Sequence, residues 1–379
     1  MKQRIGPKQL GVATLLLTLT AVLGACTSGR TPEAAGEEWI RGMDVSEARN
    51  AELHGVQFKD RDGTVKPALQ IAKDHRYNWV RVRLMIDPDV ASYGLAQDLP
   101  YVKAVMQDAK QRNLKVLLDL HYSHWWADPG NQWTPERWKG QDLNTLSASV
   151  YDYTREVITQ LRAQGTAPDM VQIGNEINAG MLWEAGRLEW EAGRVKTDRM
   201  AALVRLTNAG ATAVRDASGG REKMPPILVH IAKTGDAAAT VAWYRAFIDA
   251  GGWVDAIGLS YYPSWHGDFS GLSETIRALR SNFTQTKVYV AETAYYWDQN
   301  QVGTTNLPYP ETPQGQADFL RALTPVVRDA GGSGIFYWGA FWSQSSRWLS
   351  APGWKDDDAS RRSLFDDNAR ATPGIDGLN

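Results

Sequence analysis

Short apolar runs alternate with segments of helical period from residue 40 to residue 338. Each run is apolar along nearly its whole length, which is typical of strands in a parallel sheet that helices cover on both faces. We count eight such runs, at residues 40–45, 79–84, 115–121, 170–176, 227–231, 256–262, 288–292 and 334–338. Eight strands joined by helices predict an α/β fold, a single (β/α)8 TIM barrel.

The predicted helices between these runs have recognisable ends. An apolar stripe at helical spacing follows the second run and stops before Asn113. Its members are Leu99, Val102, Val105, Met106 and Ala109. The last long helix is predicted to begin at Thr312-Pro313 and to stop before Gly331. No glycine-rich phosphate-binding turn follows the first run, so the pattern favours a barrel over a doubly wound sheet.

Polar residues gather at the ends of the apolar runs, where barrel enzymes place their active sites. Two runs end on a glutamate, Glu176 and Glu292. Two carboxylates at one rim of a barrel are what hydrolysis of a glycosidic bond with retention requires. The other run ends add candidate supporting residues, namely Arg83, His121, Asn175, Tyr262 and Trp338. The period of two along a strand predicts that Gln172, Gly174 and Glu176 share one side.

The first residues have the pattern of a secretory signal peptide. A basic start is followed by an apolar run over residues 11–22 that is too short to span a membrane. Small residues precede Cys26, the only cysteine of 379 residues, in a pattern that resembles the lipobox of bacterial lipoproteins. We therefore expect residues 1–25 to be removed, Cys26 to be lipidated, and the exported protein to be anchored in the cell envelope. Thr27 fits sorting to an outer membrane.

Domain boundaries follow from composition. Residues 26–37 are small and polar and read as a tether, so residues 38–379 form the predicted barrel. The stretch after Trp354 carries acidic residues at 356–358 and 366–367 and is predicted to be a solvated tail around the barrel. Its acidic spacing fits no EF-hand loop, so no bound cation is expected there.

Charge and aromatic content restrict the partners. The chain has 41 basic and 43 acidic residues and no long run of either sign. A nucleic-acid partner, which would need a basic stripe, is therefore not expected. The 16 Trp and 14 Tyr outnumber the 8 Phe, and Trp and Tyr commonly face ligands that are both wet and apolar, such as sugar rings. Four of the tryptophans lie in one loop, at positions 125, 126, 133 and 138.

Longer blocks of sequence carry a resemblance to a known family. They are residues 41–46, 81–84, 118–123, 126–130, 172–183, 257–263, 265–267, 292–293 and 336–338. In these blocks the chain resembles glycoside hydrolase family 53, the arabinogalactan endo-β-1,4-galactanases of clan A. The resemblance covers nearly the whole mature chain.

The resemblance implies a retaining endo-hydrolase of β-1,4-galactan, as found in the arabinogalactan side chains of pectin. Glu176 would be the acid/base and Glu292 the nucleophile. Arg83 beside Glu292, and a hydroxyl donated by Tyr262, would keep Glu292 ionised, while drier surroundings would let Glu176 hold a proton. Asn175 would bond the 2-hydroxyl of the sugar.

The same resemblance implies a set of substrate-binding residues. Trp338 would form the floor beneath the sugar before the scissile bond. Further rings are expected to contact galactose units, and the full set is Trp125, Trp126, Trp265, His266, Trp338 and Trp342. No cofactor and no metal are expected, because the loop at 295–300 lacks a run of oxygen ligands for calcium. We expect a monomer.

Two positions depart from the family pattern. His124 stands where aspartate is expected, and Gly339 stands where glutamate is expected, so subsite preference is open. Two alternatives to a galactanase also remain. One is another clan A glycanase, such as a mannanase or cellulase. The other is a surface lipoprotein that binds glycans without cleaving them.

Overall fold

The computed structural model describes residues 38–88, 95–298, 307–342 and 361–379. The chain divides after Glu37 into two units, and the second, Glu38–Asn379, contains every described residue. The predicted signal peptide, the lipidation site Cys26 and the tether lie outside the described residues.

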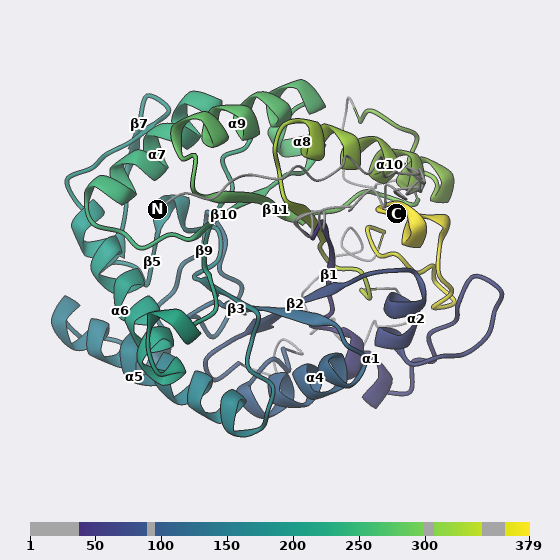
Figure 1. The fold of residues 1–379 in the computed structure, drawn as a ribbon, viewed down its shortest axis with the longest axis horizontal. Coiled ribbons are helices and arrows are strands. Elements are labelled where there is room, and N and C mark those ends of the chain that lie inside the picture. Colours follow the sequence, from purple (N-terminus) through teal and green to yellow (C-terminus); the bar gives the residue numbers. More distant parts are fainter. Residues whose placement is uncertain (1–37, 89–94, 299–306, 343–360) are drawn as a thin grey trace, which may run out of the picture. The chain divides into compact units, whose positions relative to one another are not determined.

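Eight parallel strands close into a barrel, as predicted (Figure 1). The strands are β1 (Ile40–Asp44), β2 (Trp79–Leu84), β3 (Lys115–Leu120), β4 (Met170–Ile173), β9 (Ile227–Ile231), β10 (Ala256–Ser260), β11 (Lys287–Thr293) and β12 (Gly334–Tyr337). Neighbours follow the chain order β1, β2, β3, β4, β9, β10, β11 and β12, and β12 pairs with β1 to close the ring. Each predicted apolar run overlaps one of these strands.

Helices surround the barrel (Figure 1). They are α1 (Ala48–Leu53), α2 (Ala68–Asp74), α4 (Leu99–Gln111), α5 (Leu143–Ala163), α6 (Met200–Ser218), α7 (Ala237–Asp249), α8 (Pro263–His266), α9 (Phe269–Asn282) and α10 (Pro313–Asp329). The helix start predicted at Thr312 is confirmed by its cap, and α4, which carries the predicted apolar stripe, is capped by Asp98. The Asp98 carboxylate accepts from the Tyr101 N–H at 2.9 Å, and the Thr312 hydroxyl accepts from the Gly315 N–H at 3.0 Å.

Short elements lie in the loops between the strands and helices and near the C-terminus. The loop after β4 carries the one-turn helix η2 (Ile177–Ala179) and two small hairpins, β5 (Gly180–Met181) with β6 (Gly186–Arg187) and β7 (Trp190–Glu191) with β8 (Arg194–Val195). Single 3₁₀ turns are η1 (Glu136–Trp138), η3 (Arg221–Lys223) and η5 (Pro373–Asp376). The elements after β3 and β4, namely η1, η2 and the two hairpins, build up the rim of the barrel, the end at which loops carry function.

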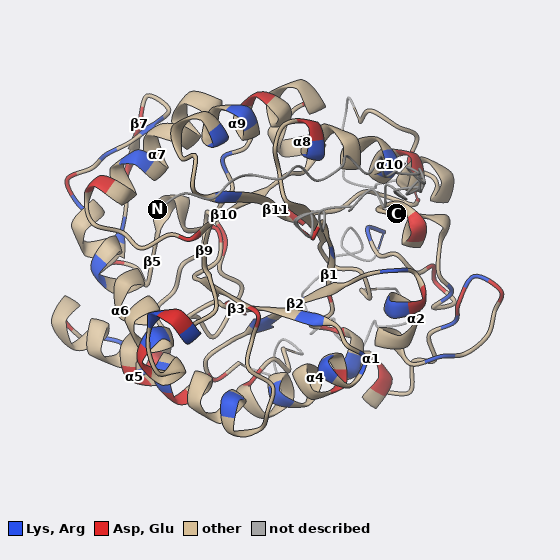
Figure 2. Cartoon of the chain, viewed as in Figure 1, with Lys and Arg blue, Asp and Glu red and all other residues tan. Residues whose placement is uncertain are grey.

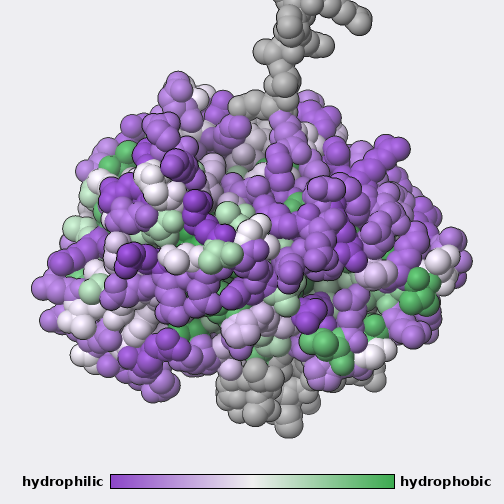
Figure 3. All heavy atoms as spheres, turned by 60° about the horizontal axis from the view of Figure 1, so that its bottom comes forward, coloured by the Kyte–Doolittle hydropathy of each residue, from purple (hydrophilic) through white to green (hydrophobic). Residues whose placement is uncertain are grey.

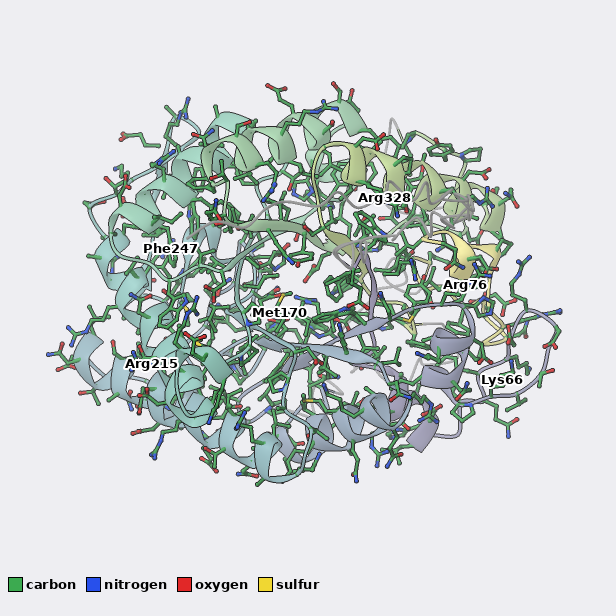
Figure 4. The ribbon with its side chains drawn as sticks, in the orientation of Figure 1. Lys66, Arg76, Met170, Arg215, Phe247 and Arg328 are labelled. Atoms are coloured by element: carbon green, nitrogen blue, oxygen red, sulfur yellow. The ribbon has the colours of Figure 1, made fainter. Side chains whose placement is uncertain are left out.

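The barrel interior is packed at its lower end by one buried residue from each strand. This apolar layer consists of Ile40, Trp79, Leu117, Met170, Leu228, Ala256, Tyr289 and Phe336. Figure 4 labels Met170 near the centre of the ring of strands, whereas Arg215 lies on α6 at the outside. Side chains fill the interior, so the barrel is a core and presents no open channel at this level.

The C-terminal segment corrects one prediction. Residues 361–379 are not a solvated tail, because Leu364 and Phe365 are buried in the main core. Phe365 stacks on Phe341 with ring centroids 4.9 Å apart, and Lys59 pairs with Arg370 as an isolated bridge. The sequence did not predict this packing, because the segment is rich in acidic residues and its apolar residues follow no regular period. Residues 343–360 lie outside the described part of the chain.

The outer surface carries charges of both signs along the helices (Figure 2). The face in Figure 3 is hydrophilic over most of its area, with small separate hydrophobic patches. Within the described residues, no helix has the length and apolar character needed to cross a membrane.

Candidate active site

Glu176 reaches the site through a turn of the backbone. β4 ends at Ile173, and the chain then passes through Gly174 at φ 76° and Glu176 at φ 47°, both in the left-handed region. The predicted alternation through residue 176 is therefore wrong beyond Ile173. A left-handed conformation is unfavourable for glutamate and is found at functional sites where surrounding contacts hold it. At Gly174 a Cβ would lie 2.6 Å from Ile177, so glycine is required.

Gln132 holds this turn from the loop after β3. Its side chain is buried, and its amide nitrogen donates to the carbonyl oxygens of Asn175 at 2.8 Å and of Asp128 at 3.0 Å. The backbone carbonyl of Gln132 in turn accepts from the Trp183 N–H at 2.8 Å. The loops after β3 and β4 are thus joined directly behind Glu176.

Glu292 reaches the site through an irregularity of the sheet. The register between β10 and β11 shifts after Leu259, so that Ser260 pairs with Glu292 and Ala291 has no counterpart. A bulge of this kind redirects the side chains that follow it. Glu292 therefore points into the barrel on the same side as Tyr289, although the two are three positions apart and strict alternation would put them on opposite sides.

Arg81 is the cation beside Glu292, and the prediction of Arg83 in this role is wrong. Nη2 of Arg81 lies 2.8 Å from Oε1 of Glu292 and 2.7 Å from Asp119. Tyr262 donates its hydroxyl to Oε2 of Glu292 at 2.9 Å, as predicted. Both arginines point into the barrel from β2, but Arg81 starts two residues deeper, at the level that Glu292 reaches from across the barrel.

Arg83 serves the rim instead. Its Nη2 pairs with Glu47 at 2.6 Å, and Nη1 lies 3.4 Å from Asp44. Its guanidinium group lies 4.3 Å from the ring centroid of Trp126, a cation–π contact that supports this indole from below. Arg83 therefore positions an aromatic wall of the groove.

The remaining predicted supporting residues are buried and hydrogen-bonded. His121 lies with Nε2 3.0 Å from Asp119, and its Nδ1 accepts from the Ala127 N–H at 3.3 Å. The Asn175 amide nitrogen donates to the Ala127 carbonyl at 2.7 Å, and its oxygen accepts from Arg81 at 2.8 Å. Asn175 is thus held by protein partners on both ends of its amide. Its predicted bond to a sugar hydroxyl stays a prediction.

The two glutamates differ in their surroundings. Burial raises the pKa of Glu176 well above its ordinary value, and the charge of Glu292 raises it further. Burial raises the pKa of Glu292 as well, but the Arg81 guanidinium opposes this, so the rise is smaller. Glu176 is therefore the carboxyl that more readily holds a proton, which is the direction predicted.

Both carboxyl groups line one groove of about 350 Å³. Aromatic rings form its walls, with Trp126 stacked on Trp342 at 5.5 Å and Trp338 at 5.3 Å from Trp342. Trp125 and Trp265 complete the aromatic lining, and Trp265 is 80% exposed. The structure thus brings five of the predicted substrate-binding tryptophans to the carboxylates.

A second groove, of about 740 Å³, adjoins the first on the side of Glu176. Glu176, Tyr262 and Trp265 line both grooves, whereas Glu292 lines only the first. The predicted residue His266 lies here, with Lys233. Burial lowers the pKa of His266 to about 4, and its Nδ1 accepts from the Tyr262 N–H at 3.0 Å.

The two departures from the family pattern lie in different places. His124 stacks on Trp133 at 6.2 Å and lines a separate groove of about 1070 Å³ with Trp183, outside both grooves of Glu176. Gly339 has φ +67°, a backbone conformation that favours glycine. Neither residue contacts Glu176 or Glu292.

Within the described residues, no three His, Cys, Asp or Glu side chains are grouped closely enough to hold a metal ion. The loop considered for calcium includes Gln299 and Asn300, which lie outside the described residues. The absence of a metal there stays a prediction.

Several residues of the site were given no role in the sequence analysis. They are Asp44, Arg81, Asp119, Gln132, Gln172, His230 and Ser260, all buried. Six of them stand inside otherwise apolar strands, and a polar residue in such a strand is the sequence feature that could have identified them. A polar group in a strand covered on both faces is costly unless it finds a partner, so it marks a network in the barrel interior. Gln132 carries no such signal, because it lies in a loop.

Comparison with known proteins agrees with this geometry. The family model described as Glycosyl hydrolase family 53 matches residues 40–378. A probable arabinogalactan endo-beta-1,4-galactanase A of Aspergillus terreus is 34% identical over 332 residues, which cover 83% of this chain and 89% of that protein. The arabinogalactan endo-beta-1,4-galactanase of Cellvibrio japonicus is 33% identical over 358 residues, which cover 89% and 91%.

Among solved structures, the GH53 catalytic domain of Ignisphaera aggregans superposes with a TM-score of 0.80 at 32% identity. The alignment covers 90% of this chain and 95% of that domain. With the family model matching from β1 to the last residues of the barrel, the chain belongs to glycosyl hydrolase family 53 and is a glycoside hydrolase.

Proposed function

We propose that the protein is a retaining endo-β-1,4-galactanase that cleaves galactan, as found in the arabinogalactan side chains of pectin. The observation that carries the proposal is that Glu176 and Glu292 line one groove. Of the two glutamates, Glu292 is the one that pairs with Arg81 and accepts the Tyr262 hydroxyl. The substrate comes from the names of the relatives from Aspergillus terreus and Cellvibrio japonicus.

The two glutamates divide the chemistry of a double displacement. Glu292, ion-paired and hydrogen-bonded, attacks the anomeric carbon, while Glu176 gives its proton to the leaving oxygen. The enzyme then carries a glycosyl ester on Glu292. Glu176, now ionised, takes a proton from water, which attacks the same carbon and releases the sugar with its original configuration.

The two grooves orient the chain on either side of the pair. The glycone lies in the groove that Glu292 lines, against Trp126 and Trp338. The leaving group lies where Glu176 continues into the second groove, beside Lys233 and His266. Because sugars bind on both sides of the pair, cleavage falls within a polymer.

Assays on purified galactan, mannan and cellulose test this proposal. We expect reducing sugar from galactan alone, and NMR of the first products should show the β anomer. Glu176→Gln and Glu292→Gln should each lower kcat by about 10³-fold or more. Activity confined to mannan or cellulose, or first products of the α anomer, would refute the proposal. Galactan binding without cleavage would favour the glycan-binding lipoprotein.

We also propose that the protein is exported, loses residues 1–25, and is anchored through lipid on Cys26 to a cell envelope, as an outer-membrane lipoprotein. The pattern of residues around Cys26 supports this. Labelling of cells with an alkyne fatty acid should mark the wild-type protein but not Cys26→Ser. Equal labelling of the two would refute it. We further propose a monomer, which light scattering of the soluble barrel would test.

A further inference from the structure

The acid/base Glu176 is the end of a hydrogen-bonded chain that runs into the barrel. Oε1 of Glu176 lies 2.5 Å from Oγ of Ser260, which lies 2.9 Å from Nε2 of His230. Nδ1 of His230 lies 2.9 Å from Oδ1 of Asn175. Ser260 and His230 are fully buried. We propose that His230 acts through Ser260 to hold Glu176 in its protonated, acid form, which makes both residues positioning residues for the proposed glycosidase reaction.

The inner end of the chain determines where the His230 proton sits. The Asn175 amide nitrogen donates to the Ala127 carbonyl, so the atom facing His230 is the amide oxygen, which can only accept. Without hydrogen on Nδ1, its lone pair would face those of the amide oxygen at 2.9 Å, which is unfavourable. The same oxygen also accepts from Arg81 at 2.8 Å and from the Gln172 amide nitrogen at 2.9 Å, and Gln172 lies further away, 3.2 Å, from Nδ1. Nδ1 therefore carries hydrogen and donates to Asn175.

Burial, together with the Arg81 charge, keeps the His230 ring neutral. Arg81 from β2 faces it, as do His121 from the end of β3 and His266 from α8, while Asp119 on β3 acts in the opposite sense. Burial and the Arg81 charge lower the pKa of His230 well below its ordinary value. A neutral ring with hydrogen on Nδ1 has a lone pair on Nε2.

The outer end of the chain then follows by elimination. The lone pair on Nε2 takes the single hydrogen of the Ser260 hydroxyl. Ser260 Oγ has no second hydrogen to offer, so the contact of 2.5 Å to Glu176 requires the hydrogen of the carboxylic acid. The hydrogen bonds from Glu176 to Ser260, from Ser260 to His230 and from His230 to Asn175 can therefore all form only when Glu176 is protonated.

This direction of hydrogen bonding suits a group that must alternate between acid and base. Once Glu176 has given its proton to the leaving group, its carboxylate and the Nε2 lone pair compete for one hydroxyl hydrogen. The ionised state is thereby destabilised, so Glu176 takes a proton back from water readily in the second step. The other charges that face Glu176 are Glu292 and Asp128, which favour the acid, and Arg81, which opposes it.

Nitrogen-15 NMR of histidine-labelled protein without substrate tests the assignment directly. The His230 signals are identified by their loss in His230→Leu. We expect a neutral ring with hydrogen on Nδ1 throughout pH 5–8. Hydrogen on Nε2, or on both nitrogens, would overturn the proposal. Because no substrate is present, this result is independent of whether the enzyme cleaves galactan.

The pH profile of kcat/KM on a short soluble galactoside tests the consequence. In His230→Leu the Ser260 hydroxyl is free to donate to the Glu176 carboxylate and so stabilises the ionised form. The fall of kcat/KM at high pH, the basic limb of the profile, should therefore begin about one pH unit lower, which corresponds to a tenfold change in the acid dissociation constant of Glu176. In His230→Leu/Ser260→Ala no hydroxyl remains, and that shift should be absent.

Gln172→Met is the matched control, because it removes another buried partner of Asn175 without touching Ser260. Its kcat should fall while its basic limb stays in place. A lower kcat without a moved limb in His230→Leu, in protein whose thermal unfolding remains cooperative, would overturn the proposal. Failure of the wild-type protein to cleave galactan would instead refute the proposed function.

Discussion

The barrel interior contains two layers of side chains, one above the other, which are both buried but differ in polarity. The lower layer is apolar and takes one residue from each strand, from Ile40 to Phe336. The upper layer, two or more residues further along the strands, is polar. Its members are Asp44, Arg81, Asp119, Gln172, His230, Ser260 and Glu292. Both layers are buried, so the comparison separates the effect of burial from the effect of polarity.

The lower layer needs only volume, whereas the upper layer needs partners. Leu117 and Met170 pack against neighbours without directional bonds. Two residues further along the same strands, Asp119 lies against Arg81, and Gln172 lies against Asn175 and His230. A buried polar network is stable only when its members are satisfied by one another.

Carboxyl groups outnumber guanidinium groups in the upper layer and at its rim. Arg81 and Arg83 form ion pairs with four carboxyls, which are Asp44, Glu47, Asp119 and Glu292, and neither arginine is paired with Glu176. Burial raises the pKa of Glu176 and of Glu47, and the nearby arginine charges do not offset this rise. A buried site with too few cations is a physical means of storing a proton near neutral pH, which acid catalysis needs.

Removal of Arg81 should have the largest effect, because it breaks the upper layer at its centre. Arg81→Met leaves Asp119 and Glu292 buried without a counter-charge, which costs about 3–5 kcal/mol of unfolding free energy. Activity should fall by about 10³-fold or more, since Glu292 loses the charge that favours its ionised form. Urea unfolding and galactan hydrolysis measure the two losses. Stability within 1 kcal/mol of wild type would contradict the argument.

A substitution in the lower layer should cost stability without changing chemistry. Leu117→Ala leaves a cavity and should lower the unfolding free energy by about 2–5 kcal/mol. The folded enzyme should keep kcat within about twofold, because Leu117 touches no group of the site. Unfolding curves and kinetics at 15 °C would check this. A large loss of kcat in folded protein would show that the layers are coupled.

The burial of Glu47 predicts that the stability of the folded protein depends on pH. Burial, the largest cause, raises its pKa to about 7 from an ordinary value of 4.5. The folded protein therefore binds this proton more tightly than the unfolded chain, and its contribution to stability is lost as pH rises from 4.5 through 7. Glu47→Gln should remove about 1–2 kcal/mol of this decline. Urea unfolding at pH 5 and pH 8 measures it, and an unchanged slope would argue against it.

The smallest effect is expected at the exposed rim. Trp265→Ala should change the unfolding free energy by less than about 0.5 kcal/mol, because the indole is 80% exposed. It should lower kcat/KM on galactan by about threefold to tenfold, since Trp265 lines both grooves. Trp253→Ala, just before β10 at the opposite end of the barrel, is the control. An equal loss of kcat/KM in both variants would show that Trp265 has no specific role in substrate binding.

Much of this site was predictable because it depends on the ends of strands. Glu176, Glu292, His121, Tyr262 and Trp338 all follow apolar runs, and parallel strands deliver their ends to one rim. Arg81 was not predictable from the same pattern. Arg81 and Arg83 have the same polarity and direction, and only the stagger of strands around a closed barrel decides which one meets a carboxylate from across the interior.

The alternation of apolar and polar residues determined the strands, their parallel arrangement and the end of the barrel that carries chemistry, because these depend on neighbours along the chain. Tertiary structure alone decided the turn at Glu176, the bulge that turns Glu292 inward, and the burial of Leu364 and Phe365 near the C-terminus. Each depends on contacts between residues far apart in sequence. Such contacts exist only once the barrel has closed and its register is set.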